Sequence, residues 1–494
     1  MSDVAQLLLP AIRWDPEQGF EGERPRIEEA LALGVGGFIL FGGDQDAVRA
    51  LVKWLRQRSR SPLLIGADME RGAGQQFAGA TGLPPLAAIA SLGDVELVRR
   101  AARHTAREAR TMGVNWDYAP VCDLDVEPDN PIVGTRSLGS DPATVARLAA
   151  AWVDACQAEG VLACAKHFPG HGRTTADSHA ELPTVTASAD TLNNSDLVPF
   201  RATIDAGVAA IMTAHVAYPA LDPSGAPATL SREILEWLLR QRLRFDNLIV
   251  TDALIMEGVL QGAGGEPAAA VRAIQAGCDL LLYPKELRAV EAALRQAVQT
   301  RQIDPERVQR SLRRRLKWAQ WASPPNEYRR PSATDVAWGA QLADRVVRVV
   351  RGTPAPLGAT AEVVVVDDDV GGPYPPPSRE PFFDALRAEG RDARRVDAPT
   401  AASKDTVVVA LFGDVRAWKG RPGYSEPARA AVAAACEAAR RQGRDAVVLQ
   451  FSHPRLAAQL TGAPAIVSAW GGDPVMQGAG ARWLARASAE AVRA

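Results

Sequence analysis

The sequence has little of what membrane proteins, secreted proteins and polyanion-binding proteins depend on. No apolar run approaches the length of a membrane span. The N-terminus does not resemble a signal peptide, because residues 2–5 carry no basic region and the apolar run 7–9 is too short. The 56 basic and 58 acidic residues give a formal net charge of -2, which argues against nucleic acid as a partner. We therefore expect a cytoplasmic protein with no membrane and no nucleic-acid partner.

Cysteine is also scarce, with five residues in a chain of 494. The five are scattered, odd in number and mostly set inside apolar runs, at Cys122, Cys156, Cys164, Cys278 and Cys436. This pattern is typical of reduced core residues and excludes a disulfide framework or a zinc site.

Histidine is rare as well, with six residues in the chain. Three of the six lie together within residues 166–179. The apolar run 160–165 leads into this segment and is typical of a buried strand. The segment then contains Pro and Gly, which indicate a loop. Titratable side chains crowded where a buried strand ends predict an active site, whereas the alternative is a loop whose His and Asp cap one another.

Short apolar strands alternate with amphipathic helical stretches through the first three hundred residues. This alternation predicts a parallel sheet covered by helices, and eight units predict a (β/α)8 TIM-type barrel. An open doubly wound sheet is the rival, but no Gly-x-Gly-x-x-Gly follows the first strand. The expected strands are 4–9, 36–41, 62–67, 114–119, 161–166, 209–213, 248–251 and 279–282, and the clearest helices are 45–58, 94–112, 142–160, 194–207 and 232–242.

Polar residues lie at or near the ends of most of these strands. They are Asp68, Glu70, Arg71, Asp117, Asp123, Lys166, His167, His215 and Asp252. Because the carboxyl ends of barrel strands meet at one face, we expect these side chains to converge there.

A second α/β pattern begins after a segment rich in Pro and Arg, 323–331, which is typical of a linker or a wrapping segment. Strands are expected at 362–366, 406–411, 446–450 and 465–468, with helices at 427–442 and 474–487. We therefore predict a barrel domain over residues 1–325 and a smaller αβα sandwich over 326–494. The acidic run 367–369 is compatible with a metal site, but a solvated loop is the simpler interpretation, since no His or Glu accompanies it at ligand spacing.

Several motifs of the first domain resemble glycoside hydrolase family 3, and within it the β-N-acetylglucosaminidase branch. Residues 166–172 read Lys-His-Phe-Pro-Gly-His-Gly, residues 177–179 read Asp-Ser-His, and residues 251–254 read Thr-Asp-Ala-Leu. Supporting matches are Gly-Thr-Arg-Ser-Leu-Gly at 134–139 and Asp-Met-Glu-Arg-Gly at 68–72. The resemblance covers most of residues 1–320, and the family's two-domain members also carry a smaller α/β domain.

The resemblance implies a role for each residue of the site. Asp252 is expected to be the nucleophile that forms a glycosyl-enzyme. His179 is expected to be the general acid/base, oriented by Asp177, which can reach one ring nitrogen from two positions away. Sugar binding is expected from Asp68, Arg136, Lys166 and His167, with Arg71 and His215 as further candidates, while His171 is expected to hold the loop. No metal and no organic cofactor are implied.

Two motifs depart from the family's familiar form. Thr-Asp-Ala-Leu replaces Ser-Asp-Asp-Leu, and Asp-Met-Glu-Arg-Gly replaces an Asp-x-Glu-Gly-Gly type, which adds Arg71 near the cleft. A cation there would suit an anionic substituent on the substrate. The resulting hypothesis is a retaining, exo-acting β-N-acetylglucosaminidase that acts on fragments of peptidoglycan or chitin as a monomer or homodimer. A phosphorylase on the same scaffold and a silent sugar-binding protein are the alternatives.

Overall fold

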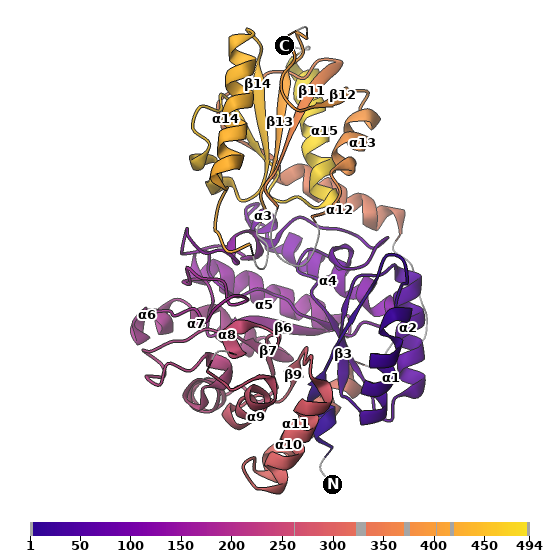
Figure 1. The fold of residues 1–494 in the computed structure, drawn as a ribbon, viewed down its shortest axis with the longest axis vertical. Helices are drawn as coiled ribbons and strands as arrows, with labels where there is room; N and C mark the ends of the chain where they lie inside the picture. Colours follow the sequence, from indigo (N-terminus) through magenta and orange to yellow (C-terminus); the bar gives the residue numbers. More distant parts are fainter. Residues whose placement is uncertain are drawn as a thin grey trace. The chain divides into compact units, whose positions relative to one another are not determined.

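The computed structural model describes residues 3–260, 262–322, 332–369, 376–401, 403–414 and 419–491. The chain divides into two compact units, each with its own sheet (Figure 1). The first unit comprises 1–81, 94–127 and 137–332, and the second comprises 82–93, 128–136 and 333–494. The second unit thus takes in two early segments that the sequence pattern did not indicate. The expected linker 323–331, with the expected boundary between residues 325 and 326, lies outside the described residues.

The first unit is a (β/α)8 barrel, as predicted. One parallel sheet has the strand order β2-β3-β4-β5-β6-β7-β8, and β1 pairs in parallel with β9. Pro10 alone separates β1 from β2, and a bridge between Val250 and Leu280 joins β8 to the β9 side, so the strands close into a ring. The strands are β1 (Leu8–Leu9), β2 (Ala11–Arg13), β3 (Gly37–Phe41), β4 (Leu64–Ala67), β5 (Trp116–Asp117), β6 (Leu162–Phe168), β7 (Ala210–Thr213), β8 (Leu248–Thr251) and β9 (Leu281–Leu282).

Helices follow the strands of the first unit. Asp44 begins α2 by accepting the N–H groups of Asp46 and Ala47, and Asp141 caps α5 in the same way. The helices are η1 (Val4–Leu7), η2 (Glu21–Glu23), α1 (Arg24–Leu33), α2 (Gln45–Arg58), η3 (Ala73–Gln75), α4 (Val95–Met112), α5 (Pro142–Ala158), α6 (Ala189–Asn194), α7 (Leu197–Asp205), η5 (Ala228–Leu230), the π-helix η6 (Glu233–Arg242), α8 (Glu257–Leu260), α9 (Glu266–Ala276), α10 (Leu287–Gln299) and α11 (Pro305–Trp321). None of the helices within the described ranges combines the length and the apolar character that crossing a membrane requires.

The interior of the barrel is packed with side chains from the strands. Trp116, Tyr118 and Met212 belong to one buried cluster, which also includes Trp318 of α11. Gly66 is required on β4 because a Cβ there would lie 2.5 Å from the hydroxyl oxygen of Tyr118. A filled barrel leaves its chemistry to the ends of the strands.

Two sequence predictions for the first unit are wrong in detail. Residues 4–7, expected as the start of a strand, form the 3₁₀ helix η1, because an apolar run that is buried in either conformation does not distinguish the two. The helix expected over 194–207 is shorter, as α7 over Leu197–Asp205, and a separate short helix, α6, ends at Asn194 before it. The gap between the two helices coincides with Ser195 and Asp196, whose side chains bind Arg173.

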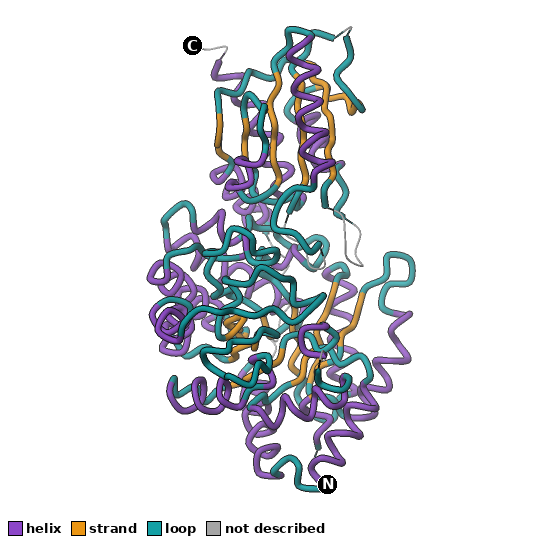
Figure 2. The backbone as a smooth tube through the Cα atoms, turned by 60° about the vertical axis from the view of Figure 1, so that its left-hand side comes forward, coloured by secondary structure: helices purple, strands orange, loops and turns teal. Residues whose placement is uncertain are grey.

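The second unit is an αβα sandwich. Its sheet has the order β10-β15-β14-β13-β11-β12, in which β10 is antiparallel to β15 and the other pairs are parallel. One face packs on α12, α13 and α15, and the other on α14 (Figure 1). Figure 2 shows helices on both faces of this sheet. The elements are α3 (Leu86–Ala90), η4 (Gly134–Arg136), α12 (Ala333–Val346), β10 (Arg348–Arg351), β11 (Thr360–Asp367), α13 (Glu380–Ala388), β12 (Asp392–Val396), β13 (Val407–Phe412), α14 (Glu426–Arg441), β14 (Ala446–Phe451), η7 (Pro454–Gln459), β15 (Ile466–Ser468) and α15 (Pro474–Ala491).

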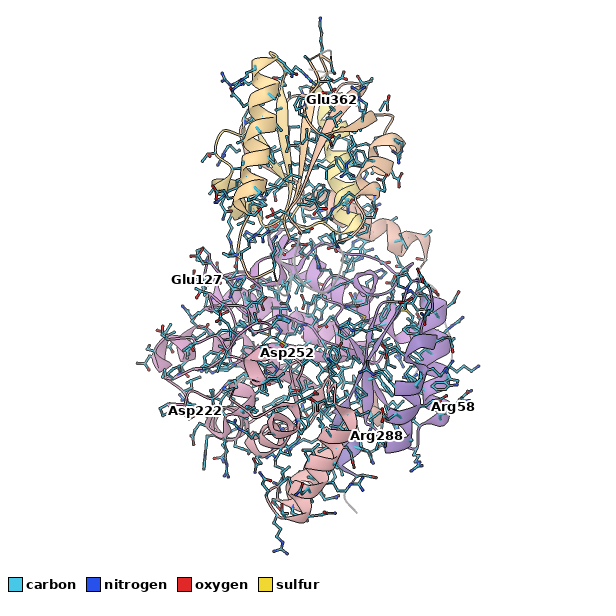
Figure 3. All side chains as sticks on the ribbon, in the orientation of Figure 1. Arg58, Glu127, Asp222, Asp252, Arg288 and Glu362 are labelled. Carbon is cyan, nitrogen blue, oxygen red and sulfur yellow. The ribbon has the colours of Figure 1, made fainter. Side chains whose placement is uncertain are left out.

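Charged side chains in the second unit form internal ion pairs. Asp367 and Asp369 bind Arg379, and Asp368 binds Arg421, at 2.7–2.9 Å. Glu362, labelled in Figure 3, is fully buried and binds Arg444 at 2.8 Å. The acidic run 367–369 is therefore engaged by arginine rather than simply solvated.

Candidate active site

The polar residues predicted at the strand ends of the barrel come together in the structure. Lys166 and His167 at the end of β6 contact Asp68 beyond β4, Asp123 beyond β5 and Asp252 beyond β8. Figure 3 shows Asp252 near the middle of the first unit. This face of the barrel therefore carries a single connected cluster of titratable groups.

Asp252 lies one residue after β8, and its side chain is 20% exposed. Its Oδ1 accepts the N–H of Ala253 at 2.7 Å, and its Oδ2 lies 3.9 Å from Nε2 of His167. Burial acts to raise the pKa of Asp252, but His167, His215, His179 and the Ala253 N–H outweigh it and lower the pKa to about 2. Asp252 is thus an ionised carboxylate with a partly accessible surface, as a nucleophile requires.

His167 connects Asp252 to a second, fully buried carboxylate. Its Nδ1 lies 2.6 Å from Oδ2 of Asp123, and Asp123 Oδ1 accepts the backbone N–H groups of His167 and His171 at 3.0 and 2.7 Å. Burial acts to raise the pKa of Asp123, but the charge and hydrogen bond of His167 lower it below its ordinary value. An ionised Asp123 fixes the His167 ring so that Nε2 faces Asp252.

Lys166 is held by two carboxylates. Its Nζ lies 2.7 Å from Oδ1 of Asp68 and 2.7 Å from Oε1 of Glu70, and only Asp68 of the three is appreciably exposed. Beneath them, burial raises the pKa of Asp117 to about 8, with Asp68 and Glu70 adding to the rise and Lys166 opposing it. An ammonium and a carboxylate presented together suit a sugar hydroxyl, which both donates and accepts.

Arg71 lies between this cluster and η3. Its backbone N–H donates to Oε1 of Gln75 at 2.9 Å, and its side chain is half-buried. Arg71 is thus one residue from Glu70, in the loop that follows β4.

His179 and Asp177 form the predicted dyad. Nδ1 of His179 lies 2.7 Å from Oδ1 of Asp177, which also accepts the His179 backbone N–H at 2.9 Å. Asp177 is buried, whereas the His179 side chain is 19% exposed. The Nδ1–H donation to Asp177 directs Nε2 away from Asp177, so Nε2 is the ring atom that is available for a proton transfer. His179 also acts electrostatically on Asp252 and His215, which places the dyad in the same site.

His171 holds the loop that carries the dyad. Its Nδ1 lies 2.8 Å from Oγ1 of Thr174 and its Nε2 lies 3.1 Å from Oγ of Ser178. Burial lowers the pKa of His171 to about 4, although Asp123 opposes the shift. A neutral imidazole bonded at both nitrogens fits the structural role expected for this residue.

His215 is fully buried and lies near Asp252. Its Nε2 donates to the carbonyl of Ala253 at 3.1 Å, and its Nδ1 lies 2.7 Å from Oγ1 of Thr229. Burial lowers the pKa of His215, against the charge of Asp252. These contacts hold the backbone directly after Asp252, and a contact of His215 with sugar stays a prediction.

Arg136 lies in η4, in the segment that groups with the second unit. Its Nη1 donates to the carbonyl of Ile132 at 3.1 Å. Its contact with sugar stays a prediction.

Asp123 and Glu70 are expected near strand ends, and no role follows for them from the sequence, although each holds a predicted site residue. Their position after a barrel strand was a usable signal. Thr229, fourteen residues from its partner His215 and in a 3₁₀ turn, gave no signal in the sequence.

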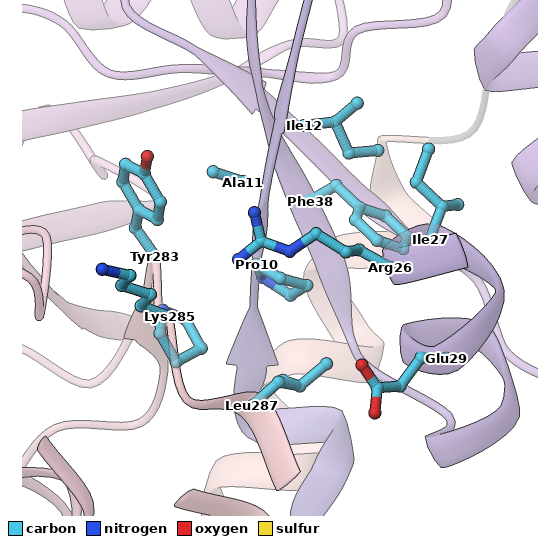
Figure 4. A pocket seen from close by; sticks show the side chains of 11 residues that line it. Pro10, Ala11, Ile12, Arg26, Ile27, Glu29, Phe38, Tyr283, Lys285 and Leu287 are labelled. Carbon is cyan, nitrogen blue, oxygen red and sulfur yellow. The ribbon is translucent and has the colours of Figure 1, made fainter. Parts of the chain in front are cut away.

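A small cavity elsewhere in the first unit is no rival to this site. It has a volume of about 50 Å³ and lies against Pro10, Tyr283 and Lys285 on one side and Arg26 and Glu29 of α1 on the other (Figure 4). That volume holds a few water molecules but no sugar ring.

Comparison with known proteins agrees with the motifs and the fold. The model of the glycosyl hydrolase family 3 N-terminal domain matches residues 2–317. A Cellulomonas fimi protein named beta-N-acetylglucosaminidase/beta-glucosidase is 36% identical over 392 residues, which is 74% of this chain and 69% of that protein. A beta-hexosaminidase of Tolumonas auensis is 42% identical over 255 residues, or 50% of this chain and 75% of the relative.

Solved structures share the fold over nearly the whole chain. A family 3 beta-N-acetylglucosaminidase from a Paenibacillus strain has a TM-score of 0.84 at 28% identity and covers 98% of this chain and 96% of its own. A beta-glucoside phosphorylase has the same TM-score at 21% identity, over 98% of this chain and 91% of its own, a likeness that shows the fold alone. The family model covers more than half of the chain, so this protein belongs to glycosyl hydrolase family 3.

Proposed function

We propose that the protein is a retaining, exo-acting β-N-acetylglucosaminidase. The observation that carries the proposal is an ionised Asp252 at the end of β8 in one site with a His179–Asp177 pair on a neighbouring loop. The names of the C. fimi, T. auensis and Paenibacillus proteins support the same activity.

In the first step, a carboxylate oxygen of Asp252 attacks the anomeric carbon and the glycosidic C–O bond breaks. Nε2–H of His179 protonates the departing oxygen, and Asp177 stabilises the imidazolium before the transfer. In the second step, His179 takes a proton from water, the resulting hydroxide attacks the anomeric carbon, and the bond to Asp252 breaks. Two inversions give net retention of configuration.

Sugar hydroxyls are proposed to bind Asp68, Lys166 and His167, with Arg136 as a further contact. The Lys166 ammonium is already oriented by Asp68 and Glu70, so little side-chain entropy is lost when a hydroxyl binds it.

The natural substrates are proposed to be cell-wall or chitin-derived fragments. Arg71 in the loop after β4 would favour fragments that carry a carboxylate or a phosphate. A cytoplasmic location is proposed as well, supported by five buried free thiols.

A phosphorylase is the second candidate, because the acid/base is a histidine. A carboxylate that has given up its proton repels a phosphate dianion, whereas a neutral imidazole does not. Two unit charges about 4 Å apart repel by roughly 4 kcal/mol at an effective dielectric near 20. However, Asp177 restores negative charge at 2.7 Å from the imidazole, so we propose water as the main acceptor.

Hydrolysis of a panel of aryl β-glycosides with and without phosphate tests both candidates. We expect N-acetylglucosaminides to be the preferred substrates and the first-formed sugar to have the β configuration by NMR. An α-configured first product would refute the retaining mechanism. Sugar 1-phosphate as the main product at millimolar phosphate would show that the protein is a phosphorylase and not a hydrolase.

A further inference from the structure

The loop that carries the dyad contains no helix or strand along its length. We call residues 170–185 the dyad loop. Arg173 binds Asp196 at 2.9 Å near its start, and the N–H of Val185 donates to the carbonyl of Ala217 at 2.9 Å at its end. Between these anchors the loop must be held where His179 can reach the substrate.

A contact beside the dyad comes from α8. The N–H of Gly258 donates to the carbonyl of Ser178, the residue between Asp177 and His179, at 3.0 Å. Gly258 is buried and lies only six residues after the nucleophile Asp252. The segment that carries the nucleophile therefore also contacts the dyad loop.

Gly258 is packed too closely for any side chain. A Cβ there would lie 2.9 Å from the carbonyl oxygen of Ser178, 3.0 Å from that of His215 and 3.1 Å from that of Glu181. All three atoms belong to backbone, which cannot turn aside as a flexible side chain can.

The backbone at Gly258 gives no other reason for glycine. Gly258 is not among the glycines with positive φ, and it lies in a helix, where alanine is more stable by about 1 kcal/mol. Glycine is required here by the close approach of two backbone segments, the dyad loop at Ser178 and Glu181 and the chain at His215.

We propose that Gly258 is a positioning residue that docks the dyad loop against the nucleophile segment, so that His179 faces the glycosidic oxygen. The proposal rests on the proposed acid/base role of His179. A methyl group at position 258 displaces Ser178, and with it the dyad, while Asp252 stays fixed at the end of β8.

Gly258→Ala and Gly258→Val test this contact between α8 and the dyad loop. The measurement is kcat/KM for aryl and alkyl N-acetylglucosaminides of increasing leaving-group pKa. We expect kcat/KM for alkyl and phenyl glycosides to fall by roughly 10- to 100-fold in Gly258→Ala, and further in Gly258→Val, because these leaving groups need protonation. Dinitrophenyl glycosides, which depart without a proton, should react at nearly the original rate. Glu257→Ala, an exposed neighbour on α8, is the matched control and should leave both classes unchanged.

His179→Ala in the same panel separates the two proposals. If His179→Ala shows no dependence on the leaving group, the acid/base assignment fails. If His179→Ala shows that dependence and Gly258→Ala behaves like the original protein, the dock is refuted. An equal loss on all leaving groups in Gly258→Ala would also refute it, because that result indicates general disruption.

Hydrogen exchange in the dyad loop gives a second measurement that does not depend on turnover. Gly258→Ala should speed exchange within 174–181, and Glu257→Ala should not. Unchanged exchange in Gly258→Ala overturns the proposal.

Discussion

The two halves of the proposed active site are built differently. Asp252, His167 and Lys166 lie at the ends of barrel strands, where buried carboxylates and backbone N–H groups fix each side chain. Asp177 and His179 lie on a loop between β6 and α6. His171 binds Thr174 and Ser178 within this loop, Arg173 pairs with Asp196, and an N–H of α8 donates to the loop backbone.

The difference follows from what each half must do. A nucleophile works best when its charge and position are set before the substrate arrives, and strand ends in a packed barrel provide that. An acid/base must exchange protons with a leaving group and then with water, which requires a less enclosed position. A loop provides access at the cost of local stability.

The largest effect is expected from removing the charge on the strand-anchored half. Asp252→Asn should lower kcat by roughly 10⁴-fold or more on every substrate, because both steps need the carboxylate. Steady-state turnover of an aryl N-acetylglucosaminide measures this, and a slow fluorinated glycoside should label Asp252 in the original protein. Asp205→Asn, exposed at the end of α7, is the control. A label on another residue would show that Asp252 is not the nucleophile.

Breaking the loop half should give a selective defect. His179→Ala should lower kcat/KM by roughly 10²–10⁴-fold for poor leaving groups and far less for activated aryl groups. Asp177→Asn should reproduce much of this loss, because the amide orients the imidazole less well and stabilises its cation less. The ratio of rates for phenyl and dinitrophenyl glycosides is the measurement. A constant ratio across the three proteins would give His179 another role.

The contribution of His171 to the free energy of unfolding should depend on pH. The pKa of His171 is about 4 in the folded protein, below its ordinary value of 6.5. Between these values the unfolded chain binds a proton that the folded chain does not. The free energy of unfolding should therefore fall by up to about 3 kcal/mol as the pH drops from 6.5 to 4, and level off above 6.5.

Urea unfolding over this pH range, with His171→Gln beside the original protein, measures the dependence. The substitution should cost most near pH 7 and progressively less toward pH 4. If the loss of unfolding free energy in His171→Gln is the same at every pH, His171 is not the source of the pH dependence.

The smallest effect is expected at Arg71, which belongs to neither half. Arg71→Gln should lower kcat/KM by about tenfold for substrates with a carboxylate or phosphate substituent, since one charge-assisted contact is lost. Neutral substrates should be unaffected. Arg58→Gln, at the exposed end of α2, is the control. Equal losses on charged and neutral substrates would contradict a role for Arg71 in selecting anionic fragments.

The sequence by itself determined the fold class, because buried parallel strands leave continuous apolar runs that alternate with amphipathic helices. Strand β8 was placed at 248–251 and helix α2 at 45–58, with the bounds that the structure has. The sequence pattern does not predict the edge strands β10 and β12, because these Arg-rich, half-exposed segments lack that apolar signal.

Only the tertiary structure decided which side chains of the site contact one another. Asp123, Glu70 and Thr229 meet their partners across 44, 96 and 14 residues of sequence, and no local pattern encodes such a pairing. The grouping of residues 82–93 and 128–136 with the second unit is likewise invisible locally. Periodicity reports which side of an element is buried, whereas a hydrogen bond or a close backbone approach, as at Gly258, depends on where two distant segments end up in space.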